Sequence, residues 1–121
     1  MMALLRSFGY AFQGMAYVWR TQRNARIHVG MACLATVAAI YFRVTAVEWA
    51  ILALTMGVVF SAEMINTVAE LAVDLLTQRQ HPLAKVAKDA GAGAVLIAAL
   101  AAVAVGLAIF GPRLLGLIWG A

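Results

Sequence analysis

The apolar positions of this chain change their spacing along its length, and the change divides the chain into predicted helices. Over residues 3–26, large apolar side chains such as Leu4 and Phe8 fall within an arc of about 80° on a helix. Arg6 and Arg20 lie on the opposite side of that helix. The pattern is typical of an amphipathic helix in the membrane interface, although a helix packed on a soluble core would show it too.

Three further segments are predicted to span a membrane, at about 27–43, about 47–77 and about 88–111. They are apolar, and about 20 apolar residues are needed to cross the hydrocarbon of a bilayer. The second segment would be about 46 Å long at 1.5 Å per residue, which exceeds the hydrocarbon thickness of about 30 Å. Three carboxylates gather in its second half, so this end is predicted to extend into the cytoplasm.

Composition strengthens the membrane interpretation. Hydrophobic residues make up 65% of the 121 residues and charged residues only 12%, whereas a soluble domain usually carries about 25% charged residues. The basic residues behind the net charge of +4 flank the apolar segments, which indicates membrane topology and no nucleic-acid partner. The sequence therefore predicts a single all-α membrane domain over residues 1–121, with three transmembrane helices and an N-terminal amphipathic interfacial helix.

The positions of the basic residues also predict the orientation. With the N-terminus in the cytoplasm, seven of the nine basic residues lie on the inner side and two on the outer side. This distribution satisfies the positive-inside rule, and the opposite orientation would violate it. The inner set is Arg6, Arg20, Arg23, Arg26, Arg79, Lys85 and Lys88, and the outer set is Arg43 and Arg113.

The long second segment carries the residues best suited to chemistry. Glu63, Asn66, Glu70 and Asp74 follow one another at spacings of three, four and four, which places them on one helix face within about 80°. Acidic groups at membrane depth are costly unless they face protein, water, a cation or a functional site. Carboxylates can hold magnesium together with substrate phosphates, and one can accept the proton of a lipid hydroxyl. With Lys88 nearby for phosphate, the set is suited to phosphoryl transfer.

Other interpretations of this acidic face stay open at the level of sequence. It could be a solvated cytosolic surface, or it could pair with basic residues of a neighbouring helix in a non-catalytic assembly subunit. A small ion or proton conductor would also place acids on one face, but polar residues should then line the full depth, and the stretch 49–60 offers only Thr55 and Gly57. His28 and His81 form no metal-ligand spacing, and His28 is interpreted as an interfacial residue.

Two motifs in the chain resemble those of the prokaryotic diacylglycerol kinase family. The run from Glu63 to Asp74 reads EMINTVAELAVD and resembles the family signature E-x-x-N-[ST]-x-x-E-x-x-V-D. Ala87-Lys88-Asp89, with the following Gly-Ala-Val-Leu run, resembles the second signature. The stretches 19–24 and 81–85 look like the Gram-positive-type branch, whose members phosphorylate undecaprenol.

The resemblance implies an ATP-dependent lipid kinase of the bacterial inner (plasma) membrane. It implies a homotrimer with composite sites at the cytoplasmic interface, Mg²⁺ as cofactor, and undecaprenol or diacylglycerol as the lipid substrate. It assigns a catalytic base with two further site residues, two metal positions, and five nucleotide contacts. These are Glu63 with Asn66 and Asp74; Glu70 and Gln22; and Tyr10, Arg79, His81, Lys88 and Asp89.

One position departs from the family pattern. The family usually has glutamate where this chain has Gln22, and that glutamate shares the metal with the residue that matches Glu70. A glutamine offers a neutral carbonyl oxygen, so we expect weaker magnesium binding that ATP phosphates and Glu70 still support. A catalytically impaired homologue is the alternative.

Overall fold

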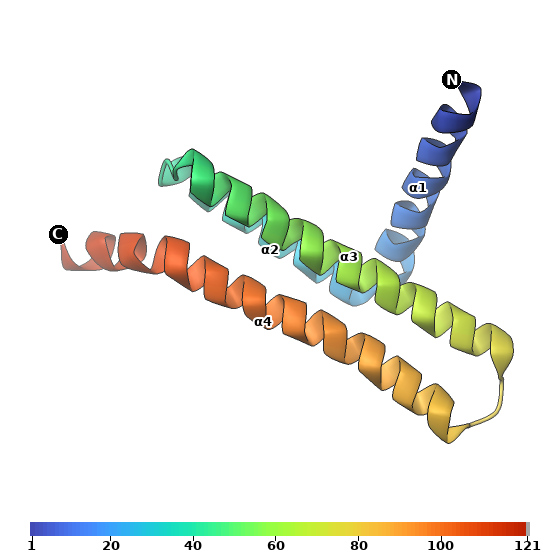
Figure 1. Cartoon of the computed structure of the whole chain (residues 1–121). Helices are drawn as coiled ribbons and strands as arrows, with labels where there is room; N and C mark the ends of the chain where they lie inside the picture. The colour runs from blue at the N-terminus through green and yellow to red at the C-terminus, as the bar shows by residue number, and fades with distance from the viewer. Residues whose placement is uncertain (121) are drawn as a thin grey trace.

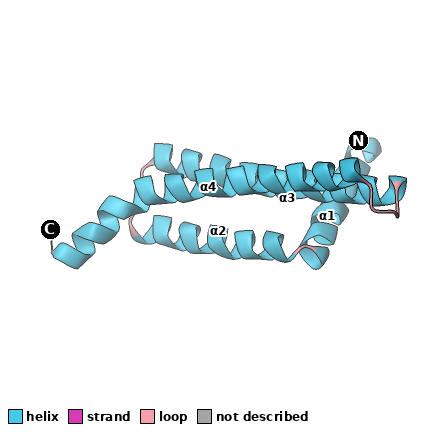
Figure 2. Ribbon diagram, turned by 90° about the horizontal axis from the view of Figure 1, so that it is seen from below, coloured by secondary structure: helices cyan, strands magenta, loops and turns pink. Residues whose placement is uncertain are grey.

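The computed structural model describes residues 1–120, and they form four helices joined by short connections (Figure 1). The helices are α1 (Met2–Thr21), α2 (Arg23–Tyr41), α3 (Ala46–Leu76) and α4 (Pro82–Trp119). Helices α2, α3 and α4 run alongside one another, while α1 turns away from them (Figures 1 and 2). Helix α3 contacts the three other helices. The predicted all-α architecture is confirmed.

The two long helices begin at residues whose side chains satisfy the first backbone N–H groups. Thr45 and Glu48 form a capping box at the start of α3, in which the Glu48 amide donates to Thr45 Oγ1 at 3.3 Å. The Thr45 amide donates to Glu48 Oε2 at 2.8 Å in return. Helix α4 begins at Pro82, whose missing N–H costs nothing at this position. His81 Nδ1 accepts from the Leu83 amide at 3.2 Å.

The prediction of one continuous helix over residues 3–26 was wrong. Helix α1 ends at Thr21 and α2 begins at Arg23, because Gln22 has an extended backbone with φ −104° and ψ 111°. The Arg26 guanidinium donates to the carbonyl oxygens of Trp19 and Arg20 at 3.3 and 3.2 Å. These bonds satisfy carbonyls at the end of α1 that lack a partner within the helix. Neither Gly nor Pro marks this break in the sequence.

The third predicted span is part of a longer helix than the segment 88–111. Helix α4 starts at Pro82 and continues through Pro112 to Trp119. Proline inside a helix removes one backbone hydrogen bond and usually bends or ends the helix. Here the helix continues past it, and the Arg113 side chain donates to the Ile109 carbonyl oxygen at 2.5 Å.

Helices α3 and α4 are both long and apolar enough to cross a membrane. Large apolar side chains are exposed along them; Leu54 and Ile97, for example, are each 71% exposed. A continuous apolar surface of this kind is suited to lipid or to another membrane helix. The structure thus supports an all-α membrane protein with two candidate spans, and a span by α2 remains a prediction.

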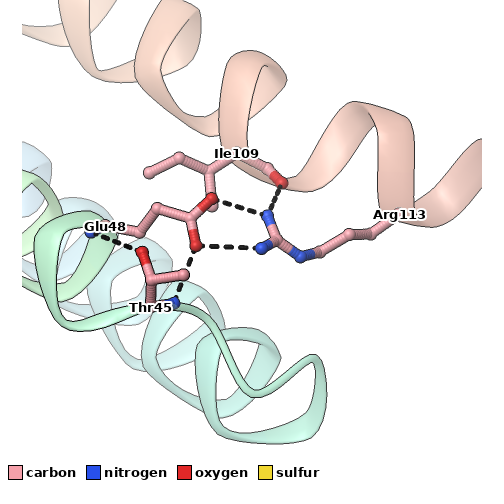
Figure 3. A network of polar contacts seen from close by, with 4 residues as sticks. All are labelled: Thr45, Glu48, Ile109 and Arg113. Carbon is pink, nitrogen blue, oxygen red and sulfur yellow. Dashed lines mark hydrogen bonds and ion pairs between the residues drawn. The ribbon is translucent and has the colours of Figure 1, made fainter.

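An ion pair joins α3 and α4 at the end where α3 begins (Figure 3). The Arg113 guanidinium donates from two nitrogens to the two oxygens of Glu48, both at 2.9 Å. Such a two-pronged contact fixes the relative position of both side chains. A small apolar cluster lies at the same end, formed by Ala39, Val44, Leu52 and Ile109. We call this region the Glu48–Arg113 end.

Candidate active site

The acidic face of α3 is buried at Glu63 and Asn66, half-buried at Glu70 and exposed at Asp74. Glu63, Asn66 and Thr67 are the buried polar residues of the described chain, with exposures of 2%, 8% and 3%. The Thr67 hydroxyl donates to the Glu63 carbonyl oxygen at 2.9 Å, within the helix. Buried polar side chains are costly without partners, so the contacts of Glu63 and Asn66 with other helices decide what this face can do.

Glu63 faces α2. The Nε2 atom of His28, near the start of α2, lies 3.2 Å from Glu63 Oε1. Although the two atoms are at contact distance, no hydrogen bond of good geometry reaches Oε1 from residues 1–120. The sequence interpretation of His28 as an interfacial residue missed this contact. The spacing of residues along α3 carried no signal for it, because His28 belongs to another helix.

Asn66 faces α4 at Gly91. A Cβ atom at Gly91 would lie 2.3 Å from Asn66 Oδ1, so the Asn66 side chain could not keep this position beside a residue larger than glycine. The Asn66 amide nitrogen donates to Glu70 Oε1 at 3.1 Å. In the described part of the chain, Asn66 Oδ1 is buried without a donor. Two oxygens of the acidic face, one on Glu63 and one on Asn66, therefore lack a hydrogen bond.

A second group of charged residues gathers where α3 ends and α4 begins. A cavity of about 980 Å³ lies there, which is near the upper limit of the size range of small-molecule sites. Lys88 Nζ donates to Asp74 Oδ1 at 2.6 Å across the two helices, and Lys85 pairs with Asp89 along α4. The structure thus brings together five of the predicted site residues in one cavity. They are Asp74, Arg79, His81, Lys88 and Asp89.

Tyr10 and Gln22 lie apart from this group. Tyr10 is 68% exposed on α1, and α1 points away from the loop between α3 and α4 (Figure 1). Gln22 is half-buried at the break between α1 and α2. Within residues 1–120, no hydrogen bond joins the Gln22 side chain to Glu70.

The donor set is compatible with magnesium only if a nucleotide supplies further ligands. Among the described residues, no three His, Cys, Asp or Glu side chains form a group that could hold a metal ion. Glu70 is half-buried and uses Oε1 to accept from Asn66. Magnesium is usually held by one or two carboxylates together with substrate phosphates. Glu70 is thus suited to a metal that arrives with ATP.

Comparison with known proteins assigns the family. Residues 9–110 match the family described as Prokaryotic diacylglycerol kinase. The chain is 42% identical over 109 residues to the undecaprenol kinase of Bacillus subtilis (strain 168), covering 90% of this chain and 89% of that protein. It is 47% identical over 116 residues to a diacylglycerol kinase of Synechocystis sp. (strain ATCC 27184 / PCC 6803 / Kazusa), covering 95% of this chain and 66% of that protein.

A more distant relative is the diacylglycerol kinase of Escherichia coli (strain K12), which is 31% identical over 100 residues, covering 83% of this chain and 82% of that protein. These relatives are all named as lipid kinases, so the predicted family and enzyme class are confirmed. The chain belongs to the prokaryotic diacylglycerol kinase family of lipid kinases.

Proposed function

We propose that this chain transfers the terminal phosphoryl group of ATP to the hydroxyl group of a membrane lipid, undecaprenol or diacylglycerol. Membership of a kinase family implies ATP as the donor and a lipid as the acceptor. The observation that carries the proposal is the buried carboxylate Glu63 within a candidate membrane-spanning helix. The same face of α3 leads from Glu63 to the charged cavity at Asp74, about 16 Å further along the helix.

Each residue of the acidic face receives a proposed role. Glu63 accepts the proton of the lipid hydroxyl as that oxygen attacks the terminal phosphorus atom and ADP leaves. Asn66 holds Glu70 through its amide group. Glu70, with Gln22 as a second position, would hold Mg²⁺, which would neutralise charge on the phosphates. Asp74 orients Lys88 through their 2.6 Å contact.

The remaining site residues are proposed to bind the nucleotide. Lys88 and Arg79 supply positive charge to the phosphates from the wall of the cavity. His81 and Asp89 line the same cavity and offer polar groups to the nucleotide. Tyr10 presents an exposed aromatic ring on α1 that can stack on a base.

A multi-pass arrangement in the bacterial inner membrane is proposed with these roles. Helix α2 has 19 residues and is about 28 Å long, close to the hydrocarbon thickness. This length supports a third span, with α1 in the interface and the N-terminus in the cytoplasm. Tyr10 and Gln22 do not line the charged cavity, which supports a homotrimer in which a neighbouring copy completes each site.

The names of the relatives give two candidate lipid substrates, undecaprenol and diacylglycerol. We propose undecaprenol as the first candidate, because residues 81–85 resemble the branch that phosphorylates it. Diacylglycerol is the second candidate. Both place a hydroxyl at the interface and apolar chains in the bilayer, so the contacts around Glu63 suit either lipid.

The decisive experiment compares phosphate transfer to the two lipids by purified protein in detergent with Mg-ATP. Wild type and Glu63→Gln are assayed side by side, and the matched control is Glu48→Gln, a carboxylate on the same helix outside the site. We expect transfer by wild type and by the control but not by Glu63→Gln. No transfer to either lipid by folded wild type would contradict the kinase proposal.

A further inference from the structure

The buried carboxylate of Glu63, on the acidic face of α3, is contacted by a residue of a different helix, α2. His28 lies on α2, and its Nε2 atom is 3.2 Å from Glu63 Oε1. The carboxylate side chain is 3% exposed and the imidazole 21%, so the contact is sheltered at the carboxylate and more open at the histidine. Thr67 bonds the backbone of Glu63 and leaves its carboxylate untouched.

A glutamate that acts as a base must present one oxygen to its substrate in a fixed direction. Its side chain has several rotatable bonds, and holding it in one rotamer requires a contact at the carboxylate itself. Within residues 1–120, His28 is the polar side chain that meets the Glu63 carboxylate. It meets Oε1, so Oε2 is the oxygen left for another partner.

We propose that His28 is a positioning residue of the lipid kinase site, holding Glu63 Oε1 so that Oε2 receives the proton of the lipid hydroxyl. The inference rests on the proposed role of Glu63 as the base. It assigns α2 a part in catalysis in addition to its packing against α3. His28 lies on α2, whereas Glu63 and the other residues of the acidic face lie on α3.

The alternative is that the contact only holds α2 against α3. The two possibilities differ in what they change, because a packing contact alters stability and assembly whereas a positioning contact alters turnover. Gln can place an amide N–H close to where His28 Nε2 lies, while Leu fills a similar volume without a donor. His28→Leu and His28→Gln therefore separate the polar contact from packing.

Removing the contact should lower kcat. We expect His28→Leu to reduce kcat about tenfold to a hundredfold, the loss expected when a buried charged group loses its polar partner. The KM for ATP should stay within about twofold, because the nucleotide cavity lies at the far end of the acidic face. His28→Gln should recover most of the lost kcat. Ile27→Ala, at an exposed neighbouring position, is the matched control.

A double variant tests whether His28 acts through Glu63. In a Glu63→Gln background, the residual turnover does not use the carboxylate, so adding His28→Leu should cause no further loss. An equal fractional loss in both backgrounds would overturn the proposal. So would wild-type kcat in His28→Leu, or a His28→Gln variant that is folded and no better than His28→Leu. Thermal unfolding and oligomer size are measured for every variant.

The same set of assays distinguishes failure of this inference from failure of the proposed function. If wild type transfers no phosphate, the proposed function fails. If wild type is active and Glu63→Gln is equally active, the role of Glu63 as base fails, and the inference fails with it. If Glu63→Gln is inactive while His28→Leu is fully active, the inference alone fails.

Discussion

The Glu48–Arg113 end and the acidic face of α3 differ in whether their carboxylates have hydrogen-bond partners. At the Glu48–Arg113 end, both oxygens of the carboxylate accept hydrogen bonds from Arg113, and Oε2 also accepts one from the Thr45 amide (Figure 3). On the acidic face, in the described residues, Glu63 Oε1 and Asn66 Oδ1 are buried without a hydrogen bond. At the Glu48–Arg113 end, protein groups alone supply the hydrogen bonds of the carboxylate.

This difference separates a structural network from a candidate catalytic one. Buried polar groups in native proteins are nearly always hydrogen bonded, so a buried polar group without a hydrogen bond needs an explanation. Sites that bind ligands commonly break this rule and are stabilised by the rest of the molecule. We expect substitutions at the Glu48–Arg113 end to change stability and those on the acidic face to change turnover.

The largest expected effect comes from replacing glutamate by glutamine, once on the acidic face and once at the Glu48–Arg113 end. Glu63→Gln removes the proposed base and should lower kcat by about a hundredfold to ten-thousandfold. Glu48→Gln keeps a hydrogen-bonding side chain and should retain kcat, but it should lower the thermal midpoint in detergent because the charge pairing with Arg113 is lost. Equal loss of turnover in both variants, with both folded, would contradict a catalytic role for Glu63 and a structural role for Glu48.

A smaller effect is expected at the charged cavity. Lys88→Met removes a positive charge from the wall and releases Asp74, to which Lys88 is bonded at 2.6 Å. We expect the KM for ATP to rise about tenfold, the size typical of one hydrogen bond to a charged group. Lys85→Met removes a more exposed lysine that pairs with Asp89 in the same cavity, and it serves as the comparison, with a smaller expected rise in the KM for ATP. A larger effect at Lys85 than at Lys88 would show that the proposed phosphate contact is misplaced.

The close approach of α4 to the acidic face can be tested with two glycines. Gly91→Ala would place a Cβ 2.3 Å from Asn66 Oδ1, whereas the same change at Gly93 meets no atom within 4 Å. We expect Gly91→Ala to cost about 1–3 kcal/mol of stability through overpacking and to lower kcat by displacing Asn66. Gly93→Ala should be close to wild type in both assays, thermal unfolding and steady-state kinetics. Similar behaviour of the two variants would mean that the helices separate without cost.

The smallest effect is expected at the metal position that departs from the family pattern. Gln22→Glu restores a carboxylate, which should lower the magnesium concentration for half-maximal activity a few fold, since a charged oxygen binds this ion better than an amide oxygen. A magnesium titration of wild type and variant measures this change. Gln13→Glu, on α1 away from the helix break, adds the same charge as a control. An unchanged titration would remove Gln22 from the proposed metal site.

The sequence by itself was sufficient for the helical architecture and for the acidic face. Apolar runs determine long helices, and spacings of three and four place Glu63, Asn66, Glu70 and Asp74 on one side because every such step turns close to one full revolution. The signature run from Glu63 to Asp74 also identified the family, which the comparison confirmed. The roles of the individual residues remain predictions.

The tertiary structure decided the contacts between helices. His28 meets Glu63, Gly91 meets Asn66, and Arg113 meets Glu48 across 65 positions of sequence. None of these pairs follows from the periodicity of one helix, because each depends on the register and crossing of two. The break at Gln22 is of the same kind: an extended residue without a Gly or Pro signal is held by Arg26 on the next helix. Local spacing determines which side chains share a face, and only packing determines what that face meets.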